Sequence, residues 1–327
     1  MGKGKKVCLI LAVILLLLSC VPLYLWLRLR QGFQEQTAAE RWKGSNEARF
    51  SQVSCFMDKS VGLSPEQEYS IRESLETALA GKSEERWILA LSGSDTVSVA
   101  RDTGQLTARV IYSAGDFSFF HPMQMVSGVW YDPDGVNRDG AVVDMQLAWK
   151  MFGGYDLQGV TVTVNGIPVQ IAGVARGAET GIEQEASGQT PTIWLPMDLM
   201  DRIGVEPKVT CVEAVLPNPV AQFAVERLNA AVGVSGSDCD LVENTNRFGL
   251  QNSLQIFLHP DSRVMRTSRV TYPFWENAAR AAESRCGIYA AALLLLLVFP
   301  AAVLLYWVVC ALRLLRKKGG ELVKKRK

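Results

Sequence analysis

The residues most able to do chemistry gather in one acidic loop, where calcium coordination is the chemistry they could serve. This loop, residues 132–140, reads DPDGVNRDG, and its oxygen-bearing side chains are Asp132, Asp134, Asn137 and Asp139. An EF-hand loop needs oxygen ligands at positions 1, 3 and 5, Gly at 6 and Glu at 12. Counted from Asp132, position 5 is Val136, and counted from Gly135, position 1 has no side chain. Because the same residue types build tight turns, we expect a turn-rich loop without a metal.

Other kinds of catalytic or ligand-binding site find no support in the sequence. The histidines are His121 and His259, and no pattern places a serine, cysteine or carboxylate beside either, as a hydrolase triad would require. The phosphate-binding pattern G-x-x-x-x-G-K-[ST] is absent, so the sequence does not predict ATP binding by that route. We therefore predict no catalytic, cofactor-binding or metal-binding residues, a structural role for His121, and a protein that is not an enzyme.

The seven cysteines lack the spacing of a metal site, since neither a CxxC nor a Cys/His pattern occurs. Cys55, Cys211 and Cys239 lie in the long central part of the chain, and the others lie in or beside apolar segments. A disulfide could form outside the cytoplasm. Cys211–Cys239 is the pairing we favour, and free buried thiols are an equal alternative.

Two segments without any Asp, Glu, Lys or Arg, residues 7–27 and 287–312, are each long enough to span a bilayer core of about 30 Å. The tails outside them hold 3 and 8 of the 34 Lys and Arg residues, with Glu321 as their one acid. Positive charge marks the cytoplasmic side of a span. We thus expect a cytoplasmic tail (1–6), a transmembrane helix (7–27), an extracytoplasmic domain with stalks (28–286), a second transmembrane helix (287–312) and a basic cytoplasmic tail (313–327) in the cell membrane. The basic residues lie beside the spans, where membrane lipid is the expected partner and nucleic acid is not.

A cleaved signal peptide is the alternative interpretation of residues 7–27, because Lys3, Lys5 and Lys6 would suit its basic region. Residues 17–20 (LLSC) also resemble a bacterial lipoprotein cleavage box. However, the apolar run continues beyond Cys20 to Trp26, whereas polar sequence normally follows a processing site. We favour an uncleaved anchor and leave cleavage open.

The clearest local pattern between the spans covers residues 139–174. Apolar residues recur at helical spacing from Met145 to Phe152, and Gly153 is typical of a helix C-terminus. Val160, Val162 and Val164 alternate with threonines, as in a half-buried strand. Asn165-Gly166 then predicts a two-residue hairpin turn, with both residues at positive φ, leading into a return strand from Ile167.

The rest of the central part mixes helices and strands, which predicts an α+β domain. Residues 28–58 and 247–284 are expected to form stalks next to the membrane, and 175–189 an exposed loop. Further helices are expected at 64–79, 197–203 and 220–232, and strands at 87–91, 96–100, 106–112, 192–195 and 209–216.

Three short motifs in this order carry a family resemblance: A-x-x-x-F-G at residues 148–153, D-x-x-G at 156–159, and an I-A-G-V strand end at 171–174. Residues 120–128 (FHPMQMVSG) and 192–199 (TIWLPMDL) fit the same pattern on either side. From about Ser64 to Val232 the chain resembles the periplasmic core domain of MacB-type ABC transporter permeases, the wider family of FtsX and LolC. Ile171 and Ala172 depart from the family pattern, which usually has two valines there.

The resemblance implies a non-catalytic membrane subunit whose extracytoplasmic domain binds a substrate or partner and relays ATP-driven motion through the stalks. It also implies a separate ABC ATPase as partner. Permeases of this family usually have four spans and this sequence shows two, so a companion permease or a second copy is expected as well. Ala290, Ala291 and Ala292 would allow close helix contact with such a partner. A stand-alone membrane-anchored receptor or scaffold is the alternative, and an enzyme of the cell envelope ranks third.

Overall fold

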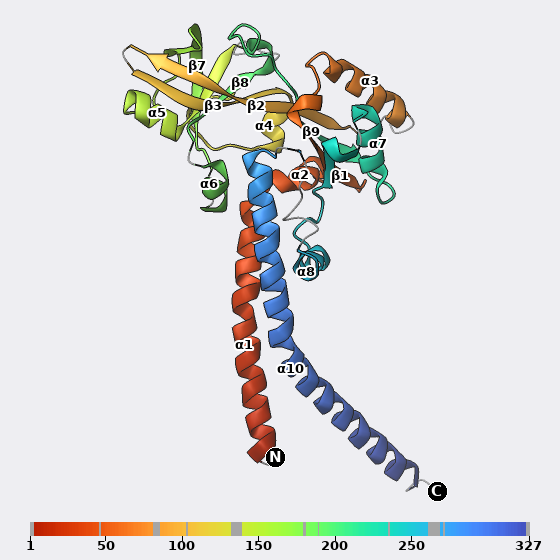
Figure 1. Ribbon diagram of the computed structural model, residues 1–327. Coiled ribbons are helices and arrows are strands. Elements are labelled where there is room, and N and C mark those ends of the chain that lie inside the picture. The colour runs from red at the N-terminus through yellow and green to blue at the C-terminus, as the bar shows by residue number, and fades with distance from the viewer. Residues whose placement is uncertain are drawn as a thin grey trace. The chain divides into compact units, whose positions relative to one another are not determined.

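The computed structural model describes residues 3–45, 47–80, 86–102, 104–131, 139–178, 181–188, 190–234, 236–260, 269–270 and 272–324 (Figure 1). The chain forms two compact units. The helical unit comprises Met1–Gly32, Phe248–Val264 and Ala282–Lys327, and the strand-rich unit comprises Phe33–Arg247 and Met265–Ala281. Most of the acidic loop, residues 132–138, lies outside the described residues.

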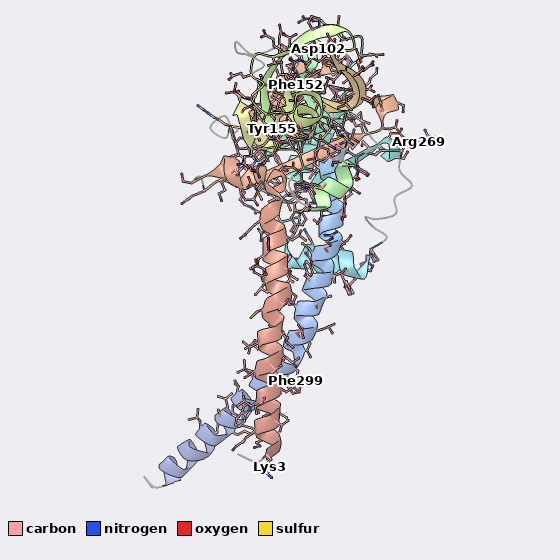
Figure 2. The ribbon with its side chains drawn as sticks, turned by 90° about the vertical axis from the view of Figure 1, so that its left-hand side faces the viewer. Lys3, Asp102, Phe152, Tyr155, Arg269 and Phe299 are labelled. Atoms are coloured by element: carbon pink, nitrogen blue, oxygen red, sulfur yellow. The ribbon has the colours of Figure 1, made fainter. Side chains whose placement is uncertain are left out.

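The helical unit contains the long helices α1 (Lys3–Gly32) and α10 (Phe274–Lys324), of which α10 begins in the strand-rich unit. Both helices are long and apolar enough to cross a membrane. The two run side by side over part of their length (Figures 1 and 2), and Lys5 Nζ lies 5.8 Å from the ring centre of Trp307. Near Phe299 α10 changes direction (Figure 2), next to Pro300, whose ring cannot donate a helical hydrogen bond. We expected Ala290 to contact a partner chain. Instead, Ala290 is fully buried within this chain, so its side chain is not open to a second one.

The strand-rich unit is built on one mixed sheet with the order β10-β1-β9-β2-β3-β8-β5-β7-β4, and β6 pairs with both β2 and β7. The pairs β3·β8 and β5·β7 are parallel and the others are antiparallel. The strands are β1 (Phe50–Met57), β2 (Ile88–Arg101), β3 (Gly104–Gly115), β4 (Met125–Gly128), β5 (Gly140–Asp144), β6 (Thr161–Val164), β7 (Ile167–Ala175), β8 (Thr192–Pro196), β9 (Cys211–Pro217) and β10 (Cys239–Glu243).

Helices cover both faces of this sheet, so the sheet has a hydrophobic core on each side. On one face α3 (Gln67–Leu79), α5 (Met145–Phe152) and α7 (Phe223–Val232) bury side chains such as Leu75, Leu147 and Leu228. On the other face, α2 (Ala38–Lys43), α4 (Phe117–Phe120) and the first turns of α10 contribute Ala39, Phe120 and Trp275. The shorter elements are the 3-10 helices η1 (Gln34–Thr37), η2 (Lys59–Val61), η4 (Met197–Leu199) and η5 (Gly236–Asp238), together with α6 (Gly181–Ser187) and α8 (Leu250–Leu258).

The pattern in residues 139–174 folds as predicted. Asp144 begins α5 by accepting a hydrogen bond from the Leu147 backbone N–H, and Gly153 ends the helix in the left-handed conformation with φ 67°. Asn165 and Gly166 form the hairpin turn at positive φ, 48° and 86°. Gly adopts a positive φ without strain and Asn tolerates it, whereas a β-branched residue is strained in this conformation. The expected α+β class is confirmed.

Several expected elements were wrong. Residues 28–58 are not a single stalk, because α1 ends at Gly32 and the chain then forms η1, α2 and the fully buried strand β1. The two strands expected at 87–91 and 96–100 are parts of one continuous strand, β2 (Ile88–Arg101). The expected loop 175–189 contains α6, whose Ile182 is buried.

The favoured Cys211–Cys239 disulfide is also wrong, because all seven cysteines are free. Cys211 packs into the core that contains Trp275, whereas Cys239 packs against the opposite core, so the sheet separates them. The alternative of free thiols holds. Burial raises the pKa of Cys211 well above its ordinary value, which makes its thiol unreactive.

Candidate functional site

The first group of buried polar residues in the strand-rich unit centres on His121, which directly follows α4. Its Nε2 lies 2.5 Å from Oε2 of Glu213 in β9, and the two side chains are 3% and 4% exposed. Its Nδ1 lies 3.6 Å from Oε1 of Glu35 in η1, a side chain that is 20% exposed. Three ionisable side chains from distant parts of the chain therefore meet inside one domain.

The environment of His121 favours the protonated ring. Burial alone would lower the pKa of a histidine, because water stabilises its charged form. Here the negative charge and hydrogen bond of Glu213, together with the nearby charge of Glu35, outweigh burial and raise the pKa of His121 to about 10. The rings of Phe117 and Trp275 pack against the imidazole, with centres 4.4 and 4.6 Å away. At neutral pH the site therefore holds a positive charge between two carboxylates in an aromatic enclosure.

A second group lies at the beginning of α10, where Glu276 binds two arginines. Arg247 donates from its two terminal nitrogens to the two carboxylate oxygens of Glu276, at 2.7 and 2.8 Å, and both side chains are 1% exposed. Arg280 donates to Glu276 at 2.7 Å and to Asp240 of β10 at 2.7 Å. Paired hydrogen bonds of this kind fix geometry as well as charge. Removing one partner of such a pair costs about 3–5 kcal/mol, since the other charge stays buried.

Neutral polar side chains join the two groups into one network. Ser54 of β1 donates to Glu213 at 3.1 Å and accepts from Asn244 at 2.8 Å. Arg247 donates to Asn244 at 3.2 Å and to Gln36 of η1 at 3.1 Å. We call this set the buried polar network, and its members are Glu35, Gln36, Ser54, His121, Glu213, Asp240, Asn244, Arg247, Glu276 and Arg280.

The buried polar network ties two chain segments to the sheet, and each segment continues into one of the long apolar helices. Residues 33–43 follow α1 directly, and Gln52 of β1 holds them by accepting from Ala38 N at 2.9 Å and donating to Glu35 O at 2.7 Å. Residues 274–281 are the first turns of α10 and carry Glu276 and Arg280. Buried polar and charged side chains thus join both segments to strands β1, β9 and β10.

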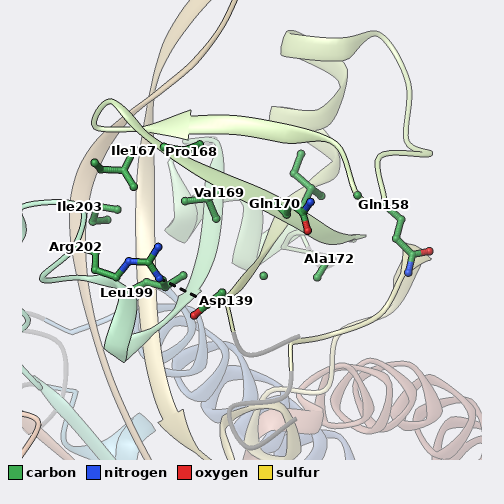
Figure 3. A pocket seen from close by; sticks show the side chains of 13 residues that line it. Asp139, Gln158, Ile167, Pro168, Val169, Gln170, Ala172, Leu199, Arg202 and Ile203 are labelled. Atoms are coloured by element: carbon green, nitrogen blue, oxygen red, sulfur yellow. Dashed lines mark ion pairs between the residues drawn. The ribbon is translucent and has the colours of Figure 1, made fainter. Parts of the chain in front are cut away.

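A groove of about 380 Å³ lies beside β5 and β7 (Figure 3). Asp139 and Arg202 form an ion pair in it at 3.6 Å, but their side chains are 65% and 58% exposed. Exposed pairs of this kind contribute about 0–1 kcal/mol, because water competes for both charges. Apolar residues, among them Ile167, Val169 and Leu199, form much of the remaining wall. Among the described residues that line the groove, the Asp139–Arg202 pair is thus a weak charged contact.

A second groove, of about 630 Å³, contains Asp144, Arg176 and Phe274 in its lining. Asp144 accepts from Leu147 N at 2.6 Å and from Thr192 N at 2.8 Å. Burial raises the pKa of Asp144 to about 6, although these N–H donors act in the opposite direction. Both carboxylate oxygens therefore serve the start of α5 and of β8, so the side chain is already used by the fold.

The structure brings one of the residues considered from the sequence into the network and leaves the others outside. His121 was expected to be structural, and no pattern indicated the carboxylates beside it. Asp139 is in the exposed ion pair with Arg202, and His259 is exposed. Asp132, Asp134 and Asn137 lie outside the described residues. Across the part of the chain that is described, no group of three or more His, Cys, Asp or Glu side chains could hold a metal ion.

Sequence reasoning missed every charged residue of the network except His121. One signal was present, because Glu213 interrupts an otherwise apolar strand, and a buried acid of this kind requires a partner. The partner itself could not be found from spacing, since His121 and Glu213 are 92 positions apart.

Comparisons with known proteins agree with the resemblance in the sequence. The family model described as the MacB-like periplasmic core domain matches residues 30–231. No curated protein matches the chain.

Solved structures include three similar domains. The periplasmic region of MacB from Actinobacillus actinomycetemcomitans is 13% identical, with a TM-score of 0.44 over 60% of this chain and 89% of that one. The extracellular domain of the ABC-type transporter YknZ from Gram-positive bacteria is 12% identical, with a TM-score of 0.41 over 58% and 99%. A domain of a permease protein from Porphyromonas gingivalis is 13% identical, with a TM-score of 0.35 over 60% and 89%.

Proposed function

Because the chain belongs to the MacB-like periplasmic core domain family of ABC-type transporter permeases, we propose that it is a non-catalytic membrane subunit that relays ATP-driven motion. Permeases of this family work with ABC ATPases, and a separate ATPase subunit is the partner proposed here. Movement of α1 and α10, driven by that ATPase, reaches the extracytoplasmic domain through residues 33–43 and 274–281. In response, the domain changes how tightly it binds a substrate or partner protein.

The buried polar network is the observation that carries this proposal. Force passes between two elements only where their connection resists deformation. A buried pair such as Arg247–Glu276 resists it, because separating the charges leaves each one without water or a partner. The segment before β1 is held by Glu35, 3.6 Å from His121, and by Gln36, which accepts a hydrogen bond from Arg247. The segment at the start of α10 is held by the ion pairs of Glu276 and Arg280.

Purification of the tagged full-length protein from the membranes of its own cell tests the partnership. Under mild detergent we expect an ABC ATPase to co-purify and the complex to hydrolyse ATP in a vanadate-sensitive manner. The protein purified away from that subunit should hydrolyse none. Recovery without any ATPase, or hydrolysis by the isolated protein, would count against the proposed function.

The membrane arrangement proposed with this function has spans at 7–27 and 287–312, cytoplasmic ends, and an extracytoplasmic domain between the spans. Its support is the basic composition of both ends. Alkaline phosphatase fused after Lys327 should be inactive, and the same enzyme inserted at Gly181, in a surface segment of the central domain, should be active. The reverse pattern would contradict the arrangement.

A further inference from the structure

Helix α8 (Leu250–Leu258) has no part in the function proposed above and carries an unusual surface. Its sequence, LQNSLQIFL, contains no charged residue. It belongs to the helical unit together with α1 and most of α10, and not to the strand-rich unit that precedes it in the chain. A helix that is grouped with two apolar helices and avoids charge requires a physical explanation.

Two close contacts hold this segment against the long helices. Trp26 of α1 donates from its indole Nε1 to the carbonyl oxygen of Phe248, two residues before α8, at 3.1 Å. At Gly287 of α10, a Cβ atom would lie 3.0 Å from the Ser253 carbonyl oxygen and 3.3 Å from Phe257 Cβ. Gly287 therefore lets the two helices approach more closely than a larger residue would allow.

The positions of these contacts give the depth of α8. Trp26 lies at the outer end of the span 7–27, and Gly287 is the first residue of the span 287–312. Both ends belong to the extracytoplasmic side in the proposed arrangement, and indole rings favour this boundary between headgroups and acyl chains. Helix α8 is therefore level with the outer surface of the hydrocarbon core.

The faces of α8 match a boundary between water and lipid. Ser253 and Ile256 are buried against the rest of the unit. Large apolar side chains on the adjoining face stay open: Leu250, Phe257 and Leu258 are 40%, 47% and 67% exposed. At 100° per residue, the exposed Gln255 lies about 160° from Phe257, on the opposite side of the helix, and Gln251 lies at the edge of the apolar face, next to Leu258. Apolar area in water costs about 25 cal/mol per Å², so this exposure is unfavourable unless something apolar covers it.

We propose that α8 is an interfacial helix, embedded in the outer leaflet with Leu250, Phe257 and Leu258 among the lipid acyl chains and Gln255 toward water. The inference rests on the membrane placement of α1 and α10 given above. A lipid surface fits better than a protein partner because exposed apolar residues adjoin both anchoring contacts. Leu25 and Leu27 flank Trp26 with 38% and 45% exposure, and Ile288 follows Gly287 with 58%. Lipid that covers these spans continues over α8 without a break.

Nitroxide scanning in the full-length protein tests this placement. The seven native cysteines are replaced, and single cysteines at positions 250, 257 and 258 are labelled, with 255 as the matched position on the polar face. The protein is placed in phosphatidylcholine–phosphatidylglycerol nanodiscs. Collision rates with O₂, which concentrates in lipid, are compared with those of a water-soluble nickel chelate. A label at Leu17, 66% exposed within the first span, and one at Asp102, 83% exposed in its side chain, set the lipid and water limits.

We expect labels at 250, 257 and 258 to give O₂-to-nickel ratios near that of position 17, and a label at 255 to give a ratio near that of position 102. Water-like ratios at 250, 257 and 258, with a lipid-like ratio at 17, would overturn the proposal and leave the membrane arrangement intact. A water-like ratio at 17 would overturn both. Low collision rates with both reagents at 257 and 258 would show a protein partner, such as a second copy, and would also overturn the lipid assignment.

Substitutions provide an independent check on the same face. Leu258→Asp places a charge among acyl chains and should move a label at position 257 toward the water limit, since a charged side chain is costly in the hydrocarbon region. Gln255→Asp places the same charge on the polar face and should leave that label unchanged. Equal effects of the two substitutions would contradict an oriented interfacial helix.

Discussion

Glu213 illustrates why the strand-rich unit needs its polar interior. A carboxylate at 3% exposure inside a sheet is costly unless charges or hydrogen bonds compensate it. His121 supplies the opposite charge, and Ser54 supplies a further hydrogen bond at 3.1 Å. Neither partner is dispensable, because each one satisfies a different oxygen of the carboxylate.

This pair gives the domain a predicted pH dependence. Glu213 and Glu35 raise the pKa of His121 to about 10 in the folded protein, above the ordinary histidine value of about 6.5. A folded-state pKa above the unfolded one adds stability at pH values below about 6.5, and this contribution is lost as the pH rises toward 10. We expect the loss to reach roughly 3–5 kcal/mol, since each pKa unit is worth about 1.4 kcal/mol.

Denaturant unfolding of the full-length protein in detergent, followed by tryptophan fluorescence between pH 6 and 10, measures this effect. His121→Gln keeps a hydrogen-bond donor but cannot titrate, so its stability should fall much less over the same interval. Parallel pH profiles for the two proteins would show that the His121–Glu213 pair is not the source.

At the scale of elements, the hairpin between β6 and β7 depends on one backbone conformation. Gly166 has φ 86°, and a Cβ added to it would meet no heavy atom within 4 Å. A β-branched residue there suffers no clash with neighbours, only backbone strain of about 1–2 kcal/mol. Gly166→Val should therefore lower the thermal midpoint by about 2–8 °C, because 1 kcal/mol corresponds to about 2–4 °C in a domain of this size.

Gly154→Val is the matched control for this prediction, because Gly154 also has open space around it and no positive φ. It should change the midpoint by less than Gly166→Val. Equal midpoints for wild type, Gly154→Val and Gly166→Val would mean that the turn does not require its glycine.

The elements that sequence could predict are those whose signals are local. Helix α5 and the β6–β7 hairpin combine a cap, a period and turn residues within a few positions, and they folded as expected. Strand β1 has no such signal, because all of its residues are buried and the polar–apolar alternation of a half-exposed strand is missing. Burial on both faces is a property of the assembled sheet. For the same reason the network could not be predicted, since its partners come from η1, β1, β9, β10 and α10.

At the scale of the whole molecule, we propose a subunit that links a membrane part to a domain outside it. Within the strand-rich unit, buried polar side chains hold both connecting segments, and within the helical unit α8 is proposed to lie in the lipid interface. In this proposal the subunit is not itself a catalyst, and its activity is a change of conformation that depends on ATP hydrolysis by a partner.

The most direct test of this relay measures a distance while ATP is hydrolysed. Spin labels are placed at Asp102 in the strand-rich unit and at Leu17 in α1, in the cysteine-free full-length protein bound to its co-purified ATPase in nanodiscs. Glu276→Gln, which removes the charge between Arg247 and Arg280, is compared with Arg202→Ala, which breaks only the exposed pair with Asp139. The account predicts a shifted distance distribution on adding ATP and vanadate, retained by Arg202→Ala and reduced by Glu276→Gln. An unchanged distribution in the wild-type complex, while the ATPase turns over, would contradict it.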